Sequence, residues 1–144
     1  MFKTKDNYYL FILNNHDRVN IIGGLASLED FDDLTFNPCK CLERETKEEL
    51  GLDINNKENV LSYSMDYLTV PDNSINVGPF GIVFTGVLNY TKDELITYFT
   101  NNRNSFDDEI KELLFFTNED YKNLDNYSSK EPYLMELLDE VNKY

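Results

Sequence analysis

The chain has 144 residues, of which 41% are hydrophobic and 14% aromatic, enough apolar material for the core of one globular domain. Its formal net charge of −14 argues against an extended nucleic-acid surface and against anionic membranes, because both would need clusters of Lys and Arg. Since the sequence contains neither a long apolar run nor a signal-peptide pattern at its start, we expect a single cytoplasmic domain over residues 1–144.

The first part of the chain predicts two strands followed by an acidic loop. Residues 8–13 form an apolar, aromatic run typical of a buried strand. Residues 19–22 predict a second strand, which ends at the glycine pair Gly23-Gly24. Residues 25–36 carry several acidic side chains without a helical or strand pattern, so we expect a long acidic loop there.

A helix is predicted over residues 38–50. Asn37 is a good N-cap, Pro38 suits the first helical position, and Gly51 can end the helix in the left-handed conformation. Four residues at helical spacing are expected to face the core: Cys39, Leu42, Thr46 and Leu50.

The rest of the chain alternates strands and helices. Strands are predicted over residues 60–70, 79–88 and 110–116. Thr91 and Glu94 form a capping box that opens a helix towards Thr100, Thr117 is a further N-cap, and residues 132–143 predict a terminal amphipathic helix. This order predicts an α/β fold with a mixed β-sheet covered by helices on both faces.

Three carboxylates are spaced to meet on the helix over residues 38–50. Glu45, Glu48 and Glu49 lie at i, i+3 and i+4 and therefore converge on one face. At about 6 Å and an effective dielectric near 20, each pair repels by roughly 3 kcal/mol before screening. A divalent cation would turn this repulsion into coordination, and oxygen ligands favour Mg²⁺ or Mn²⁺ over Zn²⁺.

The segment from Arg44 to Leu52 resembles the Nudix box, whose core reads Arg-Glu-hydrophobic-x-Glu-Glu-x-Gly-hydrophobic. Six residues stand at the matching positions, with Gly23-Gly24 upstream where the family has paired glycines: Arg44, Glu45, Glu48, Glu49, Gly51 and Leu52. The resemblance implies a Nudix-like α/β/α sandwich with a mixed β-sheet. It also implies a pyrophosphohydrolase, acting on phosphoric anhydrides, that cleaves the pyrophosphate of a nucleoside diphosphate linked to another group.

The same resemblance implies roles for individual residues. Glu48 and Glu49 would be ligands of Mg²⁺ or Mn²⁺, and Glu45 would be a further ligand or the base that deprotonates the attacking water. Arg44 would neutralise and orient the carboxylates, and the backbone carbonyl of Gly24 would approach the metal. Glu109 is the candidate for a distal acidic ligand, and either it or Glu45 is the candidate general base.

The chain departs from the family pattern in two places. Thr46 stands at the hydrophobic position of the box, and its hydroxyl needs a partner when buried. Gly24 and Arg44 lie 20 positions apart where the family has 14, so the loop is six residues longer. Either Glu29 takes the earlier acidic position of the box across this longer loop, or that role is absent.

The expected partner is a small nucleotide-derived substrate, and whether the chain forms a homodimer stays open. The loops over residues 25–36 and 71–78 are expected to select the substrate. The alternative function is a non-catalytic Nudix-like module that binds a nucleotide or a protein. The three crowded acids favour catalysis, because a pure binding module would not need them.

Overall fold

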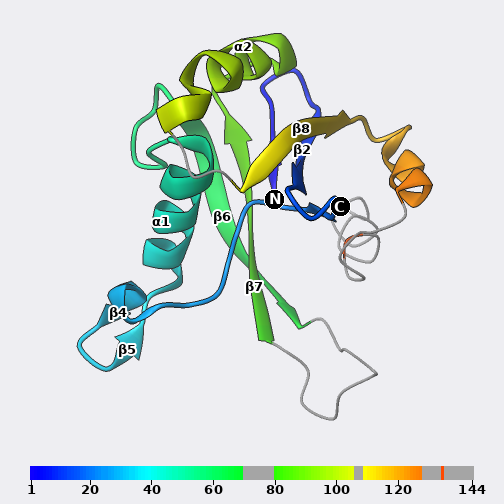
Figure 1. Cartoon of the computed structure of the whole chain (residues 1–144). Helices are drawn as coiled ribbons and strands as arrows, with labels where there is room; N and C mark the ends of the chain where they lie inside the picture. Colours follow the sequence, from blue (N-terminus) through cyan, green and yellow to red (C-terminus); the bar gives the residue numbers. More distant parts are fainter. Residues whose placement is uncertain (70–79, 106–108, 128–133, 135–144) are drawn as a thin grey trace.

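The computed structural model of the chain describes residues 1–69, 80–105, 109–127 and 134, and its centre is a mixed β-sheet (Figure 1). The sheet strands are β1 (Phe2–Lys3), β2 (Tyr9–Asn14), β3 (Val19–Asn20), β6 (Val60–Thr69), β7 (Phe80–Leu88) and β8 (Ile110–Phe116). β1 pairs with β7 in parallel, whereas the pairs β1–β2, β2–β3, β2–β8 and β6–β7 are antiparallel. The α/β class and the mixed sheet are therefore as the sequence predicts.

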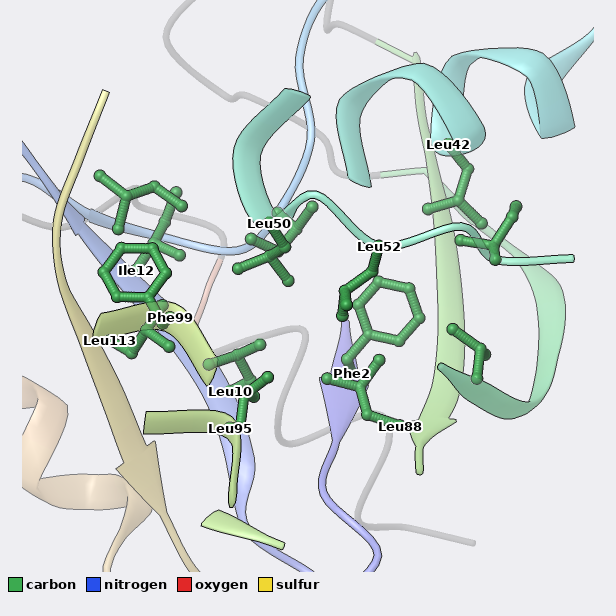
Figure 2. Close-up of a cluster of buried hydrophobic side chains, with 14 of the residues drawn as sticks. Phe2, Leu10, Ile12, Leu42, Leu50, Leu52, Leu88, Leu95, Phe99 and Leu113 are labelled. Carbon is green, nitrogen blue, oxygen red and sulfur yellow. The ribbon is translucent and has the colours of Figure 1, made fainter. Parts of the chain in front are cut away.

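Helices α1 (Pro38–Leu50) and α2 (Lys92–Asn102) pack on the same face of this sheet. Figure 2 shows Leu50 and Leu52 at the end of α1 beside Leu10 of β2 and Leu95 of α2. These four side chains are almost completely buried, in one cluster that also holds Phe2 and Leu88. The packing fixes the C-terminal half of α1 against the sheet, and this half of the helix carries the acidic residues.

A second apolar cluster covers the opposite face. It joins β2 and β8 to the 3₁₀ helix η3 (Tyr121–Asn126) through Phe11, Phe116 and Leu124. The Phe11 and Phe116 rings meet edge to face with their centroids 5.8 Å apart. The sheet is thus covered on both faces over the part of the chain that the structure describes.

α1 begins and ends where its local signals place it. The Asn37 side chain accepts a hydrogen bond from the Cys39 backbone N–H at 3.1 Å, and Gly51 has φ 68°. The expectation that Cys39 faces the core was wrong, because this side chain is exposed. The buried face of α1 starts only at Leu42, since the first helical turn lies beyond the core.

The acidic segment over residues 25–36 is more ordered than a simple loop. It contains the 3₁₀ helix η1 (Leu28–Asp30) and a small hairpin of β4 (Phe31–Asp32) and β5 (Thr35–Phe36). The Phe31 and Phe36 rings lie opposite each other with centroids 5.5 Å apart, and Asp33 turns the chain at φ 55°. Figure 1 shows this hairpin projecting from the N-terminal end of α1.

The remaining elements follow the predicted order with small shifts. β3 is only two residues long, although Ile21 and Ile22 after it are buried as expected of a strand. α2 is capped by the Thr91–Glu94 box and runs to Asn102, and a short 3₁₀ turn, η2 (Arg103–Ser105), follows it. The N-cap of η3 is Asp120 and not Thr117 as expected; Thr117 instead accepts a hydrogen bond from the Asp120 N–H in the turn before η3.

Two expectations fall largely outside the described residues. They are the loop over residues 71–78 and the terminal helix over residues 132–143, of which only Leu134 is described. Among the described helices, none has the length and apolarity needed to cross a membrane.

Candidate functional site

The glycine pair after β3 lies directly against the acidic face of α1. The Gly23 backbone N–H donates a hydrogen bond to Oε2 of Glu49 at 3.1 Å, and Gly23 has φ 149°, which favours glycine. A Cβ atom placed on Gly24 would lie 2.3 Å from Oε1 of Glu45. The residue at position 24 therefore has to be a glycine for the Glu45 carboxylate to approach the backbone.

Arg44 connects three acidic side chains. Its Nη1 lies 2.7 Å from Oε1 of Glu45 and 3.2 Å from Oε2 of Glu48. On its other side the guanidinium holds Asp30 in a two-pronged pair, Nε to Oδ1 at 3.1 Å and Nη2 to Oδ2 at 2.9 Å. The hydrogen bonds with Asp30 and then Glu45 raise the pKa of Arg44 above its usual value, so its positive charge is a permanent part of the site.

Asp30 is the buried acidic residue that the longer loop brings to Arg44 of α1. Glu29, which the sequence suggested for this position, is exposed, whereas Asp30 is 1% exposed. Asp30 also accepts a hydrogen bond from the Ser27 N–H at 2.8 Å and closes the capping box of η1. The hydrogen bonds to Arg44 lower the pKa of Asp30 to about 2, so this carboxylate is ionised at neutral pH.

Sequence reasoning missed Asp30, although a signal for it was present. Ser27 and Asp30 stand at the spacing of a capping box, in which the acid turns back towards the start of its own helix. That pattern predicts an ordered acid at this point of the loop. It does not reveal that Arg44 would lie within reach.

Burial and crowding act together on the two inner acids of α1. Burial raises the pKa of Glu49 to about 8; the Gly23 N–H opposes this shift, and the neighbouring carboxylates Glu45, Glu109 and Glu48 add to it. Burial also raises the pKa of Glu45, while Arg44 lowers it. Burial is therefore the main cause of both shifts, and the neighbouring carboxylates act in the same direction.

The structure brings most of the expected site residues together, at different depths. Glu45 and Glu49 are buried and face Gly23-Gly24, whereas Glu48 keeps about half of its side chain exposed at 49% and pairs with Arg44. Glu109, just before β8, is exposed and contributes to the site through its charge on Glu49. Glu109 is thus an outer member of the cluster.

The donor chemistry of this cluster fits a hard divalent cation, although the side chains do not form a preorganised coordination site. Within the described ranges, no three acidic, imidazole or thiol groups are gathered closely enough to hold a metal ion. Arg44 pairs with Glu45 and Glu48, and Glu49 turns to the Gly23 N–H. The residues that would hold Mg²⁺ or Mn²⁺ supply only oxygen donors, which these ions prefer.

Comparison with models of known protein families finds none that matches this sequence. A search of curated proteins likewise finds no significant match.

Proposed function

We propose that this chain is a metal-dependent hydrolase of the Nudix type, with Mg²⁺ or Mn²⁺ as cofactor. Its substrate would be a nucleoside diphosphate linked through its pyrophosphate to another group. The observation that supports this proposal best is the close approach of Gly23-Gly24 to Glu45 and Glu49, because it joins the two halves of the sequence motif in space.

The acidic residues have separate tasks in this proposal. Glu45, Glu48 and Glu49 would hold the cation with the Gly24 carbonyl, and Glu109 would approach from the start of β8. When bound, the cation polarises a phosphoryl oxygen and lowers the pKa of a water molecule. Glu45 or Glu109 would accept the proton of the attacking water as general base.

Arg44 has a positioning task. It spans Glu45, Glu48 and Asp30, so it sets the directions of two carboxylates of the site while Asp30 holds it from behind. Binding of a cation would require Arg44 to share Glu45 and Glu48 with it. Arg44 would then neutralise the remaining negative charge of the carboxylate cluster.

The test is a substrate panel of nucleoside triphosphates, dinucleoside polyphosphates, ADP-ribose and nucleotide sugars, incubated with Mg²⁺ or Mn²⁺. We expect turnover of at least one compound, loss of activity in EDTA, and loss in Glu48→Gln. Glu43→Gln is the matched control, because Glu43 is an exposed acid on the same helix. Activity that persists after complete metal removal would overturn the proposal.

One observation favours the alternative of a non-catalytic nucleotide- or protein-binding module. Arg44 already pairs with two of the three box carboxylates, so the cluster is partly neutralised without a cation. In that case the panel would show no turnover with either metal. Calorimetry would instead detect nucleotide binding, which EDTA would leave unchanged.

A further inference from the structure

β6 forms one end of the main sheet. The order of strands runs β3-β2-β1-β7-β6, so β6 pairs with β7 on one side, and within the described residues no strand lies on its other side. β6 extends over ten residues. A strand of this length at a sheet edge presents a row of backbone donors and acceptors to another chain.

The pairing of β7 shows which backbone groups of β6 point outward. The Gly86 N–H donates to the Met1 carbonyl at 3.1 Å and the Phe84 carbonyl accepts from Met1, so both residues direct their backbone groups away from β6. Tyr63 lies opposite Gly86 and Met65 lies opposite Phe84. Because facing residues of such pairs turn their N–H and C=O groups away from each other, those of Tyr63 and Met65 point to the open edge.

The side chains at this edge are apolar and partly exposed. Leu61, Tyr63 and Met65 alternate along the strand with exposed fractions of 43%, 36% and 36%. At the start of the strand, Lys57 Nζ donates to the Leu61 carbonyl at 3.0 Å and covers that acceptor. The part of the edge available to another chain is therefore centred on Tyr63 and Met65.

The charge of the strand limits what can pair with it. Residues 60–69 contain a single ionisable acid, Asp66, in a chain whose net charge is −14. Two copies of this chain repel each other over most of their surface, and this repulsion is smallest where charges are few. β6 is such a segment, and an antiparallel strand pair is self-complementary about a two-fold axis.

We propose that the chain forms a homodimer in which β6 pairs antiparallel with β6 of a second copy. A two-fold axis near Ser64 would place Tyr63 opposite Met65 of the second copy, and each pair would exchange two backbone hydrogen bonds. The apolar side chains at positions 61, 63 and 65 would become covered across the same face. This dimer joins the two sheets into one continuous sheet.

Sedimentation equilibrium over a range of protein concentrations tests the dimer. We expect a concentration-dependent monomer–dimer equilibrium in the wild type and monomers for Tyr63→Lys and Met65→Lys, because a charged lysine on an edge strand would have to be buried against the second copy and opposes strand pairing. Ile96→Lys is the matched control, since Ile96 belongs to α2 and is similarly exposed, at 39%. A monomeric wild type, or a dimer that survives both substitutions, would overturn the proposal.

Amide hydrogen exchange resolves the strand itself and needs no substitution. The Tyr63 and Met65 amides should gain protection as protein concentration rises, by at least about 10-fold in exchange rate between mostly monomeric and mostly dimeric samples. Ser64 lies between them, opposite Thr85, and its amide points to β7, so its protection should stay constant. Equal behaviour of all three amides would contradict pairing through this edge.

Discussion

Thr46 is completely buried on α1, and its hydroxyl has no hydrogen-bond partner among the described residues. An unpaired buried hydroxyl lowers stability, whereas a methyl group of the same size would not. Thr46→Val should therefore raise the free energy of unfolding by about 1 kcal/mol, measured by urea denaturation.

Thr97→Val is the control for this substitution. Thr97 lies on the exposed side of α2, and its hydroxyl donates to the Asp93 carbonyl at 2.9 Å. The same change of chemistry should leave stability there almost unchanged or slightly lower. A lower stability of Thr46→Val would show that the Thr46 hydroxyl is satisfied in solution.

Asp30 gives a second prediction at the scale of single residues. Asp30→Asn removes the charge from a buried carboxylate that accepts two hydrogen bonds from Arg44. We expect a loss of roughly 1–3 kcal/mol in the free energy of unfolding. Glu29→Gln, one position earlier and exposed, should change stability by less than about 0.5 kcal/mol. Equal losses in the two variants would show that Arg44 is held in another way.

The same carboxylate predicts a pH dependence. The pKa of Asp30 is about 2 in the folded chain, below its ordinary value of 3.8, so the folded state binds this proton less tightly than the unfolded state. The stabilisation is therefore complete above about pH 5 and is lost as the pH falls through 3.8 towards 2. In acid titrations followed by circular dichroism, Asp30→Asn should lack this component, whereas Glu29→Gln should retain it.

A substitution of Glu48 tests whether this residue binds a metal ion or serves a structural role. Glu48→Gln removes one charge from the crowded face but also an exposed i,i+4 ion pair with Arg44, worth about 0.3–0.5 kcal/mol. The two effects oppose each other, so the metal-free variant should be within about 1 kcal/mol of the wild type, while kcat falls at least about 100-fold. A strongly destabilised variant with near-normal turnover would mean that Glu48 serves as an ion-pair partner of Arg44.

At the scale of elements, α1 was predictable to the residue because its signals are local. Asn37, Pro38 and Gly51 each act through the backbone of their own helix end, so no distant contact is needed to place the boundaries. The face that it buries was predicted less well. Cys39 shares the helical spacing of Leu42, but a spacing does not show where the helix first meets the core.

The hairpin of β4 and β5 was not predictable in the same way. Its strands have two residues each, too short to show an alternating pattern. Contacts that hold it in place include the pair of Asp30 with Arg44 and the Asn37 N–H donating to the Asp30 carbonyl at 2.7 Å, and Asp32 of β4 pairs with Lys40. The first of these contacts joins residues 14 positions apart and depends on the completed fold.

The segment over residues 25–36, which includes this hairpin, is expected to influence which substrate is selected. Shortening residues 30–35 would also remove Asp30, so substitutions at exposed positions are the cleaner test. Leu28 in η1 and Leu34 between β4 and β5 are 91% and 96% exposed in the loop that we expect to select the substrate, so the pair Leu28→Ser and Leu34→Ser should change relative kcat/KM among substrates by about 10-fold or less and leave metal affinity unchanged.

Ile96→Ser on α2 is the control, and it should leave substrate preference unaltered. Equal losses of kcat/KM for every substrate in the Leu28→Ser, Leu34→Ser double variant would indicate a role in folding or in the chemical step.

At the scale of the whole molecule, the class of the fold followed from the order of elements, but the sheet topology did not. The short parallel pair of β1 and β7 joins Phe2 to Gly86, and the two-residue β1 has no pattern of its own in the sequence. The edge position of β6 follows from that arrangement. Strand order is decided by packing between distant segments, which periodicity does not encode.

The net charge of −14 makes the whole chain sensitive to salt, and this general effect has to be separated from specific cation binding at the site. Salt should stabilise this chain by screening its self-repulsion, and Mg²⁺ would do so even without a specific site. If a specific site is present, we therefore expect the Tm in MgCl₂ to be higher than the Tm in NaCl of equal ionic strength. A specific site contributes about 2.7 kcal/mol when the cation is present at 100 times its Kd.

Glu45→Gln and Glu48→Gln should lose this excess of Mg²⁺ over NaCl while keeping the response to NaCl. Glu43→Gln should keep both the response to NaCl and the additional response to Mg²⁺. Glu43 lies on the same helix outside the cluster, so this substitution removes the same charge without changing the site. Equal stabilisation by the two salts in the wild type would mean that the carboxylates on α1 act only through their general charge. The cation would then have no specific place among Glu45, Glu48 and Glu49.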